Sequence, residues 1–168
     1  MGYSTDFTGE FILDQPLTNA QVLYLSKFSE TRRMCRDEAL TAKRPDPIRE
    51  AVGLPVGRDG GYFVAEGGWA GQDDGDDVTD YNCEPFDQPG LWCHWVPTND
   101  GEAIEWDGSE KFYNYVEWIE YIIEHFLKRW GRTLNGEVEW SGEDDDDRGK
   151  IVIEDNSVTT RVARIVWE

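Results

Sequence analysis

The chain of 168 residues has few basic side chains, only two histidines and only three cysteines. Lys and Arg number 16 against 35 Asp and Glu, which gives a formal net charge of −19. Such a charge repels nucleic acid and anionic membranes at long range and attracts cations and basic proteins. We therefore expect no direct binding to nucleic acid or to membranes, and a basic protein or nucleoprotein complex as the partner. The same composition also serves plain solubility.

The cysteines follow neither of the common structural patterns. Their number is odd and no CxxC motif is present, which argues against both a disulfide framework and a zinc ribbon. Reduced thiols are the default in a cytosol. The first residues lack the apolar segment of a secretory signal, and no apolar run approaches the roughly 20 residues of a membrane span. We expect a cytoplasmic protein.

Signatures of the familiar enzyme classes are missing. G-x-S-x-G, the P-loop and G-x-G-x-x-G are all absent, and neither His94 nor His125 lies in a local motif for nucleophilic catalysis. Cys83, Cys93 and His94 do not have the spacing of a zinc site, and the acidic runs do not follow the EF-hand order. We predict a non-enzymatic protein with no catalytic residues, no cofactor and no specific metal site.

One segment, Asp107–Gly131, has a clear helical pattern. From Phe112 to Trp130, apolar residues recur in steps of four and three, which is the period of one helix face. Asp107 and Glu110 have the spacing of a capping box. We predict a long helix over about 110–130, with a sheet packed on its apolar face.

The other elements predict an α+β fold. A second helix is expected from Thr18 or Asn19 to about Arg36, and Asp100-Gly101 predicts a hairpin turn. We expect one domain, 1–168, with a mostly antiparallel sheet of five to seven strands packed against two helices. Alternation predicts strands at Asp6–Asp14, Gly61–Glu66, Leu91–Val96, Glu102–Asp107, Thr133–Ser141, Gly149–Glu154 and Val158–Val166.

Charge is unevenly distributed along the chain. Between Arg58 and Lys111 there is no Lys or Arg but 14 Asp and Glu, and this stretch includes a loop predicted at about 67–88. A loop of that length is often functional or disordered. The acids form a solvated loop, a surface for a basic partner or a weak site for divalent cations. The candidate partner-binding residues are Asp73, Asp74, Asp76, Asp77, Asp80, Glu143, Asp144, Asp145 and Asp146.

Basic residues concentrate before the acidic stretch. Arg32, Arg33 and Arg36 lie near the end of the second predicted helix, where cations are favoured by the helix dipole. Arginine also makes bidentate contacts with phosphate. An alternative hypothesis is therefore an anion site that binds or processes a small molecule such as a signalling nucleotide.

Three stretches carry a resemblance to a known group. MGYSTDFTGEF, EAIEWDGSEKFYNYVEWIEYIIEHFL and LNGEVEWSGEDDDDRGKIVIEDN resemble small proteins of bacteriophages and prophages. The resemblance implies an accessory protein in the host cytosol and assigns no catalytic residue. Small acidic phage proteins often bind host defence proteins, sometimes as mimics of nucleic acid, as anti-CRISPR proteins do. Our leading hypothesis is such an inhibitor, and a phage housekeeping factor is the alternative.

Overall fold

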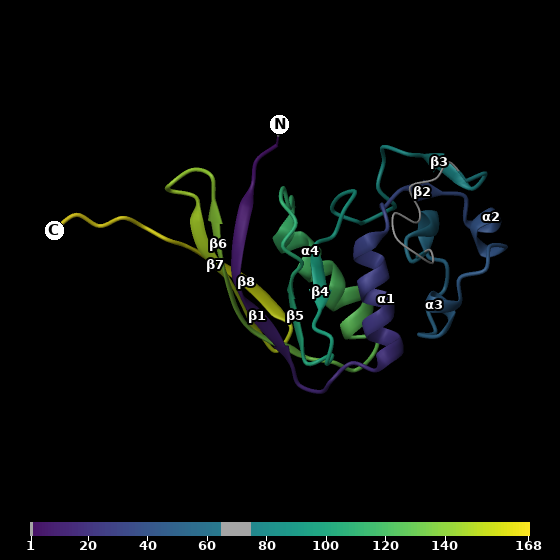
Figure 1. Cartoon of the computed structure of the whole chain (residues 1–168), viewed down its shortest axis with the longest axis horizontal. Coiled ribbons are helices and arrows are strands. Elements are labelled where there is room, and N and C mark those ends of the chain that lie inside the picture. The colour runs from purple at the N-terminus through teal and green to yellow at the C-terminus, as the bar shows by residue number, and fades with distance from the viewer. Residues whose placement is uncertain (1, 65–74) are drawn as a thin grey trace. The chain divides into compact units, whose positions relative to one another are not determined.

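The computed structural model describes residues 2–64 and 75–168. The chain divides into two compact units. Unit 1 contains Met1–Pro16 and His94–Glu168, and unit 2 contains Leu17–Cys93. Figure 1 shows the elements of both units coloured along the chain. The predicted α+β class is confirmed, while the single domain over 1–168 stays a prediction beside this division.

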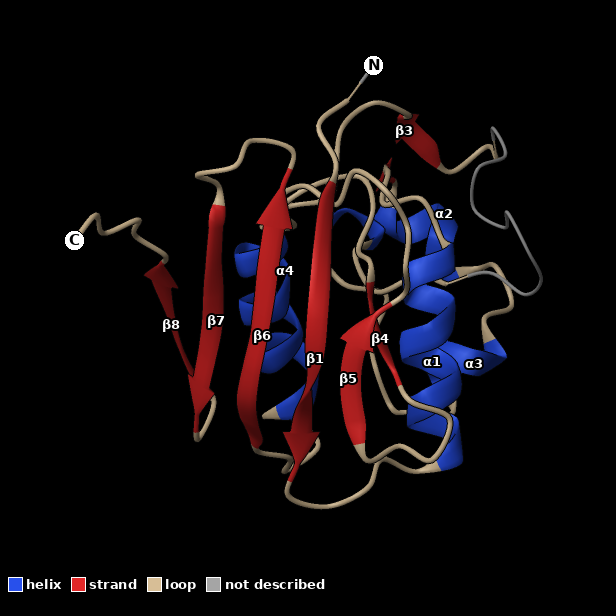
Figure 2. Ribbon diagram, turned by 60° about the vertical axis from the view of Figure 1, so that its left-hand side comes forward, coloured by secondary structure: helices blue, strands red, loops and turns tan. Residues whose placement is uncertain are grey.

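Unit 1 is built on a six-stranded antiparallel sheet, which agrees with the predicted five to seven strands. Its order is β4-β5-β1-β6-β7-β8 (Figure 2). The tight Asp100-Gly101 turn joins β4 to β5 as predicted. The strands are β1 (Thr5–Leu13), β4 (Trp95–Pro97), β5 (Ala103–Trp106), β6 (Leu134–Gly142), β7 (Arg148–Glu154) and β8 (Ser157–Val162).

Alternation of buried and exposed side chains gives the sheet one apolar and one largely polar face. In β1, Phe7 and Phe11 are buried while Asp6 and Glu10 are exposed. Side chains of a strand point alternately to opposite faces, so these pairs belong to opposite sides of the sheet. The register of β1 with β6 places Phe7 opposite Trp140 on the buried face.

The strand β8 forms one edge of this sheet. The residues that follow it extend away from the sheet in Figure 1. They leave large apolar side chains exposed, with Trp167 90% exposed. The exposed apolar residues in this region are Val162, Ile165, Val166 and Trp167.

The predicted long helix covers the apolar face of the sheet (Figure 2). It comprises α4 (Tyr115–Ile122) and a π-helical turn, η2 (Ile123–Leu127). The Tyr115 ring lies 4.9 Å from that of Phe7, centroid to centroid. Trp95 Nε1 donates to the Tyr115 carbonyl at 2.8 Å. Aromatic packing and one buried indole hydrogen bond therefore join the helix to the sheet.

The helix begins later than the sequence predicted. Asp107 does not cap it, because its carboxylate accepts the Ser109 N–H at 2.8 Å and lies 3.0 Å from His94 Nδ1. The residue before the helix, Asn114, has a left-handed backbone with φ of 56°. The predicted capping box at Asp107 and Glu110 is therefore wrong, since local turns take up the polar groups.

Unit 2 combines short helices with a two-stranded sheet. Helix α1 (Asn19–Glu30) begins with the capping box expected at Thr18. It ends well before Arg36, because Thr31 is extended and its hydroxyl donates to the Lys27 carbonyl at 2.7 Å. The remaining elements are β2 (Cys35–Arg36), α2 (Glu38–Ala42), α3 (Pro47–Glu50), the 3-10 turn η1 (Arg58–Gly60) and β3 (Val78–Asp80).

Two of the predicted strands differ from the structure. Residues 61–64 form a turn and irregular backbone, so the described part of Gly61–Glu66 is not a strand. The strand predicted at Leu91–Val96 is shorter and begins only at Trp95. None of the helices within the described ranges has the length and apolar composition that crossing a membrane requires.

Gly149 of β7 provides a test of the sheet. A Cβ at this position would overlap the Trp140 ring and the Arg161 carbonyl. Because packing this close cannot relax without moving backbone, Gly149→Ala should lower the free energy of unfolding by about 1–3 kcal/mol. Urea unfolding followed by tryptophan fluorescence measures it. Ser141→Ala, at an exposed position of β6, is the control, and equal stability of the two variants would contradict the packing described.

Candidate functional site

The carboxylate of Asp77 lies in a cluster of hydrogen-bond donors inside unit 2. Its side chain is 3% exposed. Arg36 and Arg44 each donate to it at 2.9 Å, and the Thr41 hydroxyl donates at 2.9 Å. Burial alone would raise the pKa of Asp77, but the hydrogen bonds from Thr41 and Arg36 outweigh it and lower the pKa. The carboxylate is therefore held charged inside the unit.

The two arginines that hold Asp77 also pack on an aromatic ring. The guanidinium carbons of Arg36 and Arg44 lie 4.3 and 4.7 Å from the centroid of Phe63. A desolvated cation over an aromatic face is stabilising. Phe63, which the sequence predicted to lie in a strand, therefore packs against both arginines of the Asp77 ion-pair cluster.

A second buried ion pair lies at α3. Asp46 accepts from Arg49 Nε and from the Val64 N–H, both at 3.1 Å. Arg49 also donates to the Leu54 carbonyl at 2.6 Å. Pro47 is the first residue of α3, where a missing N–H costs nothing. Asp46 and Asp77, the buried acids among the described residues of unit 2, are thus both paired with arginine.

The anion site predicted at Arg32, Arg33 and Arg36 needs correction. Arg33 is 1% exposed and donates to the carbonyls of Phe63 at 2.7 Å and Gly61 at 3.2 Å. Arg36 is buried against Asp77. Only Arg32 is partly exposed, and it contacts the Tyr81 ring and carbonyl. These guanidinium groups organise the fold, so they do not form a phosphate-binding patch.

The predicted acidic surface at 73–80 is only partly accessible. Asp73 and Asp74 lie outside the described residues. Asp76 and Asp80 are exposed, as an interaction surface requires. Asp77 is a correction, because its carboxylate is buried in the arginine cluster. Residues Glu143–Asp146 belong to unit 1, so the two acidic runs belong to different units.

The β6–β7 connection is an ordered acidic turn. Its residues Glu143–Asp146 are exposed. Asp147, which follows, is held by donors from the Tyr3 hydroxyl at 2.7 Å and from Trp140 Nε1 at 3.0 Å. The Tyr3 hydroxyl in turn accepts the Asp144 N–H at 3.1 Å. This turn, which we call the acidic turn, is fixed by hydrogen bonds on its inner side while its carboxylates face solvent.

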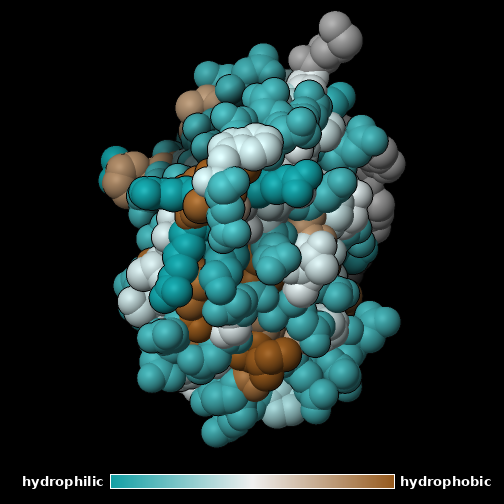
Figure 3. Space-filling model, turned by 90° about the vertical axis from the view of Figure 1, so that its left-hand side faces the viewer, coloured by the Kyte–Doolittle hydropathy of each residue, from teal (hydrophilic) through white to brown (hydrophobic). Residues whose placement is uncertain are grey.

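Further carboxylates continue from the acidic turn along the polar face of the sheet. Asp6 and Glu10 of β1 and Glu137 and Glu139 of β6 are exposed on this face. Glu10 and Glu137 lie directly opposite each other in the register, an arrangement that costs stability between like charges. Figure 3 views the molecule from this side, where hydrophilic residues dominate. We call these four residues the acidic stripe.

The stripe leads to a groove at the far end of β1. The groove has a volume of about 330 Å³ and has no basic residue in its lining. Thr98 donates to Asp100 at 2.6 Å, and this hydrogen bond lowers the pKa of Asp100. The acids that line it are Glu10, Asp14, Asp100 and Glu102. Sequence reasoning missed the groove and the stripe, because these acids are isolated along the chain and only the sheet brings them together.

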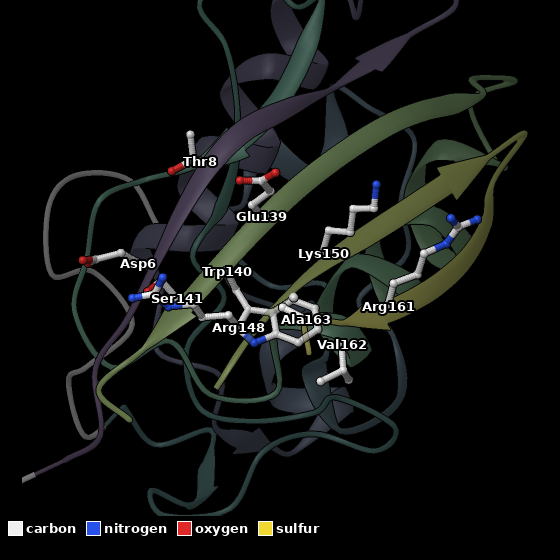
Figure 4. Close-up of a pocket in the computed structure, with 11 residues that line it drawn as sticks. Asp6, Thr8, Glu139, Trp140, Ser141, Arg148, Lys150, Arg161, Val162 and Ala163 are labelled. Carbon is white, nitrogen blue, oxygen red and sulfur yellow. The ribbon is translucent and has the colours of Figure 1, made fainter. Parts of the chain in front are cut away.

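A larger groove, of about 430 Å³, lies on the same face toward β7 and β8. Arg148, Lys150 and Arg161 line it together with Asp6 and Glu139. Figure 4 shows that Lys150 and Arg161 extend in a similar direction, while Arg148 points away from them. Lys150 also forms an ion pair with Glu137 at 3.2 Å. The groove is therefore mixed in charge, with Lys150 and Arg161 opposite each other on neighbouring strands.

The described residues 2–64 and 75–168 contain no group of three or more His, Cys, Asp or Glu that could hold a metal ion. His94 and Asp107 form a pair at 3.0 Å on one side of the sheet unit. Burial would raise the pKa of Asp107, but the His94 hydrogen bond outweighs it and lowers the pKa. A histidine–carboxylate pair alone supplies a base and its orienting group without a nucleophile.

Comparison of the chain with protein-family models, with curated proteins and with solved structures finds no match. The resemblance to phage and prophage proteins therefore stays a prediction. The function proposed below is based on the acidic turn, the acidic stripe and the groove lined by Glu10, Asp14, Asp100 and Glu102, which we call the acidic groove.

The neighbouring acids Asp76 and Asp77 test the buried cluster. Asp77→Asn should lower the free energy of unfolding by about 3 kcal/mol, because two arginines would lose their anion inside the unit. Asp76→Asn removes the same charge from an exposed position and should change stability by about 0.5 kcal/mol or less. Urea unfolding measures both. Equal effects would show that Asp77 does not act as a buried ion-pair partner.

Acid should weaken the contribution of Asp77. Its pKa is lower in the folded than in the unfolded chain, so its stabilisation is complete above the unfolded value of about 3.9 and is lost as pH falls through the folded value. The difference in stability between wild type and Asp77→Asn should therefore shrink below about pH 4. Urea midpoints at pH 7 and at acid pH measure this difference, and a difference that grows with acid would contradict the ion-pair model.

Proposed function

We propose that the protein is a non-enzymatic, phage-encoded inhibitor that binds a basic groove of a host defence or nucleic-acid-binding complex, in the manner of anti-CRISPR proteins. Its carboxylates stand in for the phosphates of nucleic acid. The observation that carries the proposal is the set of exposed carboxylates that the sheet of unit 1 brings together in the acidic turn, the acidic stripe and the acidic groove, beside the basic residues Arg148, Lys150 and Arg161. The phage context rests on the sequence resemblance, and the site of action is the host cytosol.

The dimensions of this surface suit a nucleic-acid mimic. The nine residues of β1 span about 30 Å at roughly 3.4 Å per residue. Duplex DNA rises about 3.4 Å per base pair, so the surface corresponds to about nine base pairs. The acidic turn lies beside the start of β1, where Ser4 N–H donates to Glu143 at 2.7 Å. The acidic groove lies at the end of β1.

The ordering of the acidic turn supports binding rather than mere solubility. A solvated acidic loop needs no internal hydrogen bonds, whereas this turn is fixed by Tyr3, Trp140 and Asp147. A preformed binding surface loses less conformational entropy on association. Complementary charge also accelerates encounter and makes it sensitive to salt. The alternative hypothesis of a nucleotide-binding site is weakened, because two of its three arginines, Arg33 and Arg36, are buried in unit 2.

Removal of charge from the acidic turn tests the proposal. The triple variant Asp144→Asn, Asp145→Asn, Asp146→Asn should retain fewer nucleic-acid-binding complexes from bacterial lysate, because the steering charge is lost. The retained complexes are measured by capture with tagged protein at low and at raised salt, followed by mass spectrometry. We expect at least about a tenfold drop in the salt-sensitive fraction, as loss of about 1.4 kcal/mol would give.

The matched control changes the same number of charges elsewhere in unit 1. Glu110, Glu117 and Glu120 are exposed residues at and before α4, which covers the opposite face of the sheet. Their triple change to Gln should leave capture nearly unchanged. If both triple variants lose the same proteins to the same degree, net charge and not the acidic turn determines binding, and the proposed surface is wrong.

The variant Tyr3→Phe tests the order of the acidic turn without changing its charge. The variant keeps every acid but removes the hydroxyl that donates to Asp147 and accepts from Asp144. With the captured complex immobilised, the dissociation rate should rise about three- to tenfold, since the freed turn must be ordered again on binding. Unchanged kinetics would contradict a preformed turn as part of the interface.

A further inference from the structure

Unit 2 brings two of the three cysteines side by side. Cys35 lies in β2, and Cys83 follows β3 in the chain. The Cys35 N–H donates to the Cys83 carbonyl at 2.8 Å. Both thiols donate to one acceptor, the Glu84 carbonyl, at 3.1 Å from Cys35 and 3.5 Å from Cys83. The two sulfurs therefore lie beside the same carbonyl oxygen, although their residues are far apart in sequence.

The backbone geometry at this point suits a disulfide. Cys83 lies in a bend just after β3, and its carbonyl accepts the Cys35 N–H at 2.8 Å, which holds the main chains of the two residues in direct contact. Disulfides connect Cα atoms that are about 4.4–6.8 Å apart. Because both thiols already point at the Glu84 carbonyl, their side chains extend to the same side. A sulfur–sulfur bond here would join two residues whose main chains are already hydrogen-bonded and whose thiols share one acceptor.

The two thiols differ in accessibility. Cys83 is exposed and Cys35 is partly buried. Burial and, to a smaller extent, the neighbouring Cys83 thiol raise the pKa of the Cys35 thiol to about 12. Cys93, the third cysteine, is buried. A soluble oxidant therefore reaches Cys83 first, and Cys35 is the nearest second thiol.

We propose that Cys35 and Cys83 form a two-thiol oxidation site that hydrogen peroxide converts to an intramolecular disulfide. This site is independent of the acidic surface proposed above for partner binding. It would also covalently join β2 to the segment after β3, next to the cluster in which Arg36 of β2 binds Asp77.

The chemistry is balanced by one peroxide. The Cys83 thiolate attacks the peroxide oxygen, the O–O bond breaks, and Cys83 becomes a sulfenic acid as one water leaves. The Cys35 sulfur then attacks the Cys83 sulfur, the S–OH bond breaks, and hydroxide leaves as water with the Cys35 proton. Two electrons pass from the thiols to the peroxide, and the products are one disulfide and two waters.

Peroxide treatment of the folded full chain tests the site directly. After alkylation of remaining thiols in denaturant, digestion without reductant should yield one linked peptide pair containing Cys35 and Cys83, with a mass lower by two hydrogen atoms. Titratable thiols should fall from three to one, and the remaining alkylated cysteine should be Cys93. Addition of dithiothreitol should restore all three.

Single variants provide the controls. Cys93→Ala should still form the linked pair, whereas Cys35→Ser and Cys83→Ser should not. In Cys35→Ser, the sulfenic acid at Cys83 should persist and react with dimedone, because its resolving thiol is gone. Sulfinic or sulfonic acid at Cys83 of the wild type with Cys35 still alkylated, or disulfides only between two chains, would overturn the proposal.

Discussion

Only sixteen basic side chains are available to neutralise 35 acidic ones in this chain, and several of the arginines are used inside the fold. Arg36 and Arg44 bind the Asp77 carboxylate, Arg49 binds Asp46, and Arg33 donates to backbone carbonyls. A buried carboxylate without such partners would be far too costly. Every arginine placed in the interior is therefore unavailable to neutralise the surface. The scarcity of cations thus explains both the order of unit 2 and the uncompensated acids outside.

Acidic residues that look alike in sequence have different roles for this reason. Asp76 and Asp77 are neighbours, yet one is exposed and the other is buried among arginines. Asp147 ends the second acidic run, yet it is the one bound by Tyr3 and Trp140. Each run thus contributes a carboxylate, Asp77 or Asp147, that accepts hydrogen bonds from side chains of other elements. Among the described residues, Asp76 in the first run and Asp144, Asp145 and Asp146 in the second are exposed beside it.

Periodicity predicts the sheet well, because a half-buried strand alternates wherever it lies. The ranges expected for β1, β6 and β7 agree closely with the structure. Local patterns fail where distant residues compete for the same groups. Asp107 binds His94 and so does not cap the long helix. Likewise, neither the Asp77 cluster nor the pairing of Cys35 with Cys83 leaves a local signal, since each joins residues about 40 or more positions apart. The acidic groove depends on strand register and could not be predicted from the sequence.

The open edge of the sheet has a consequence for colloidal behaviour. β8 offers unpaired backbone groups along one side, and exposed Val162, Ile165 and Trp167 continue from it. Such edges invite further strands from other molecules unless charge keeps the molecules apart. At neutral pH the net charge of −19 provides that repulsion. Near the isoelectric point of about 4.3 the repulsion vanishes. Precipitation near that pH should then begin at β8, as edge-to-edge strand addition that leaves the polar face of each sheet unobstructed.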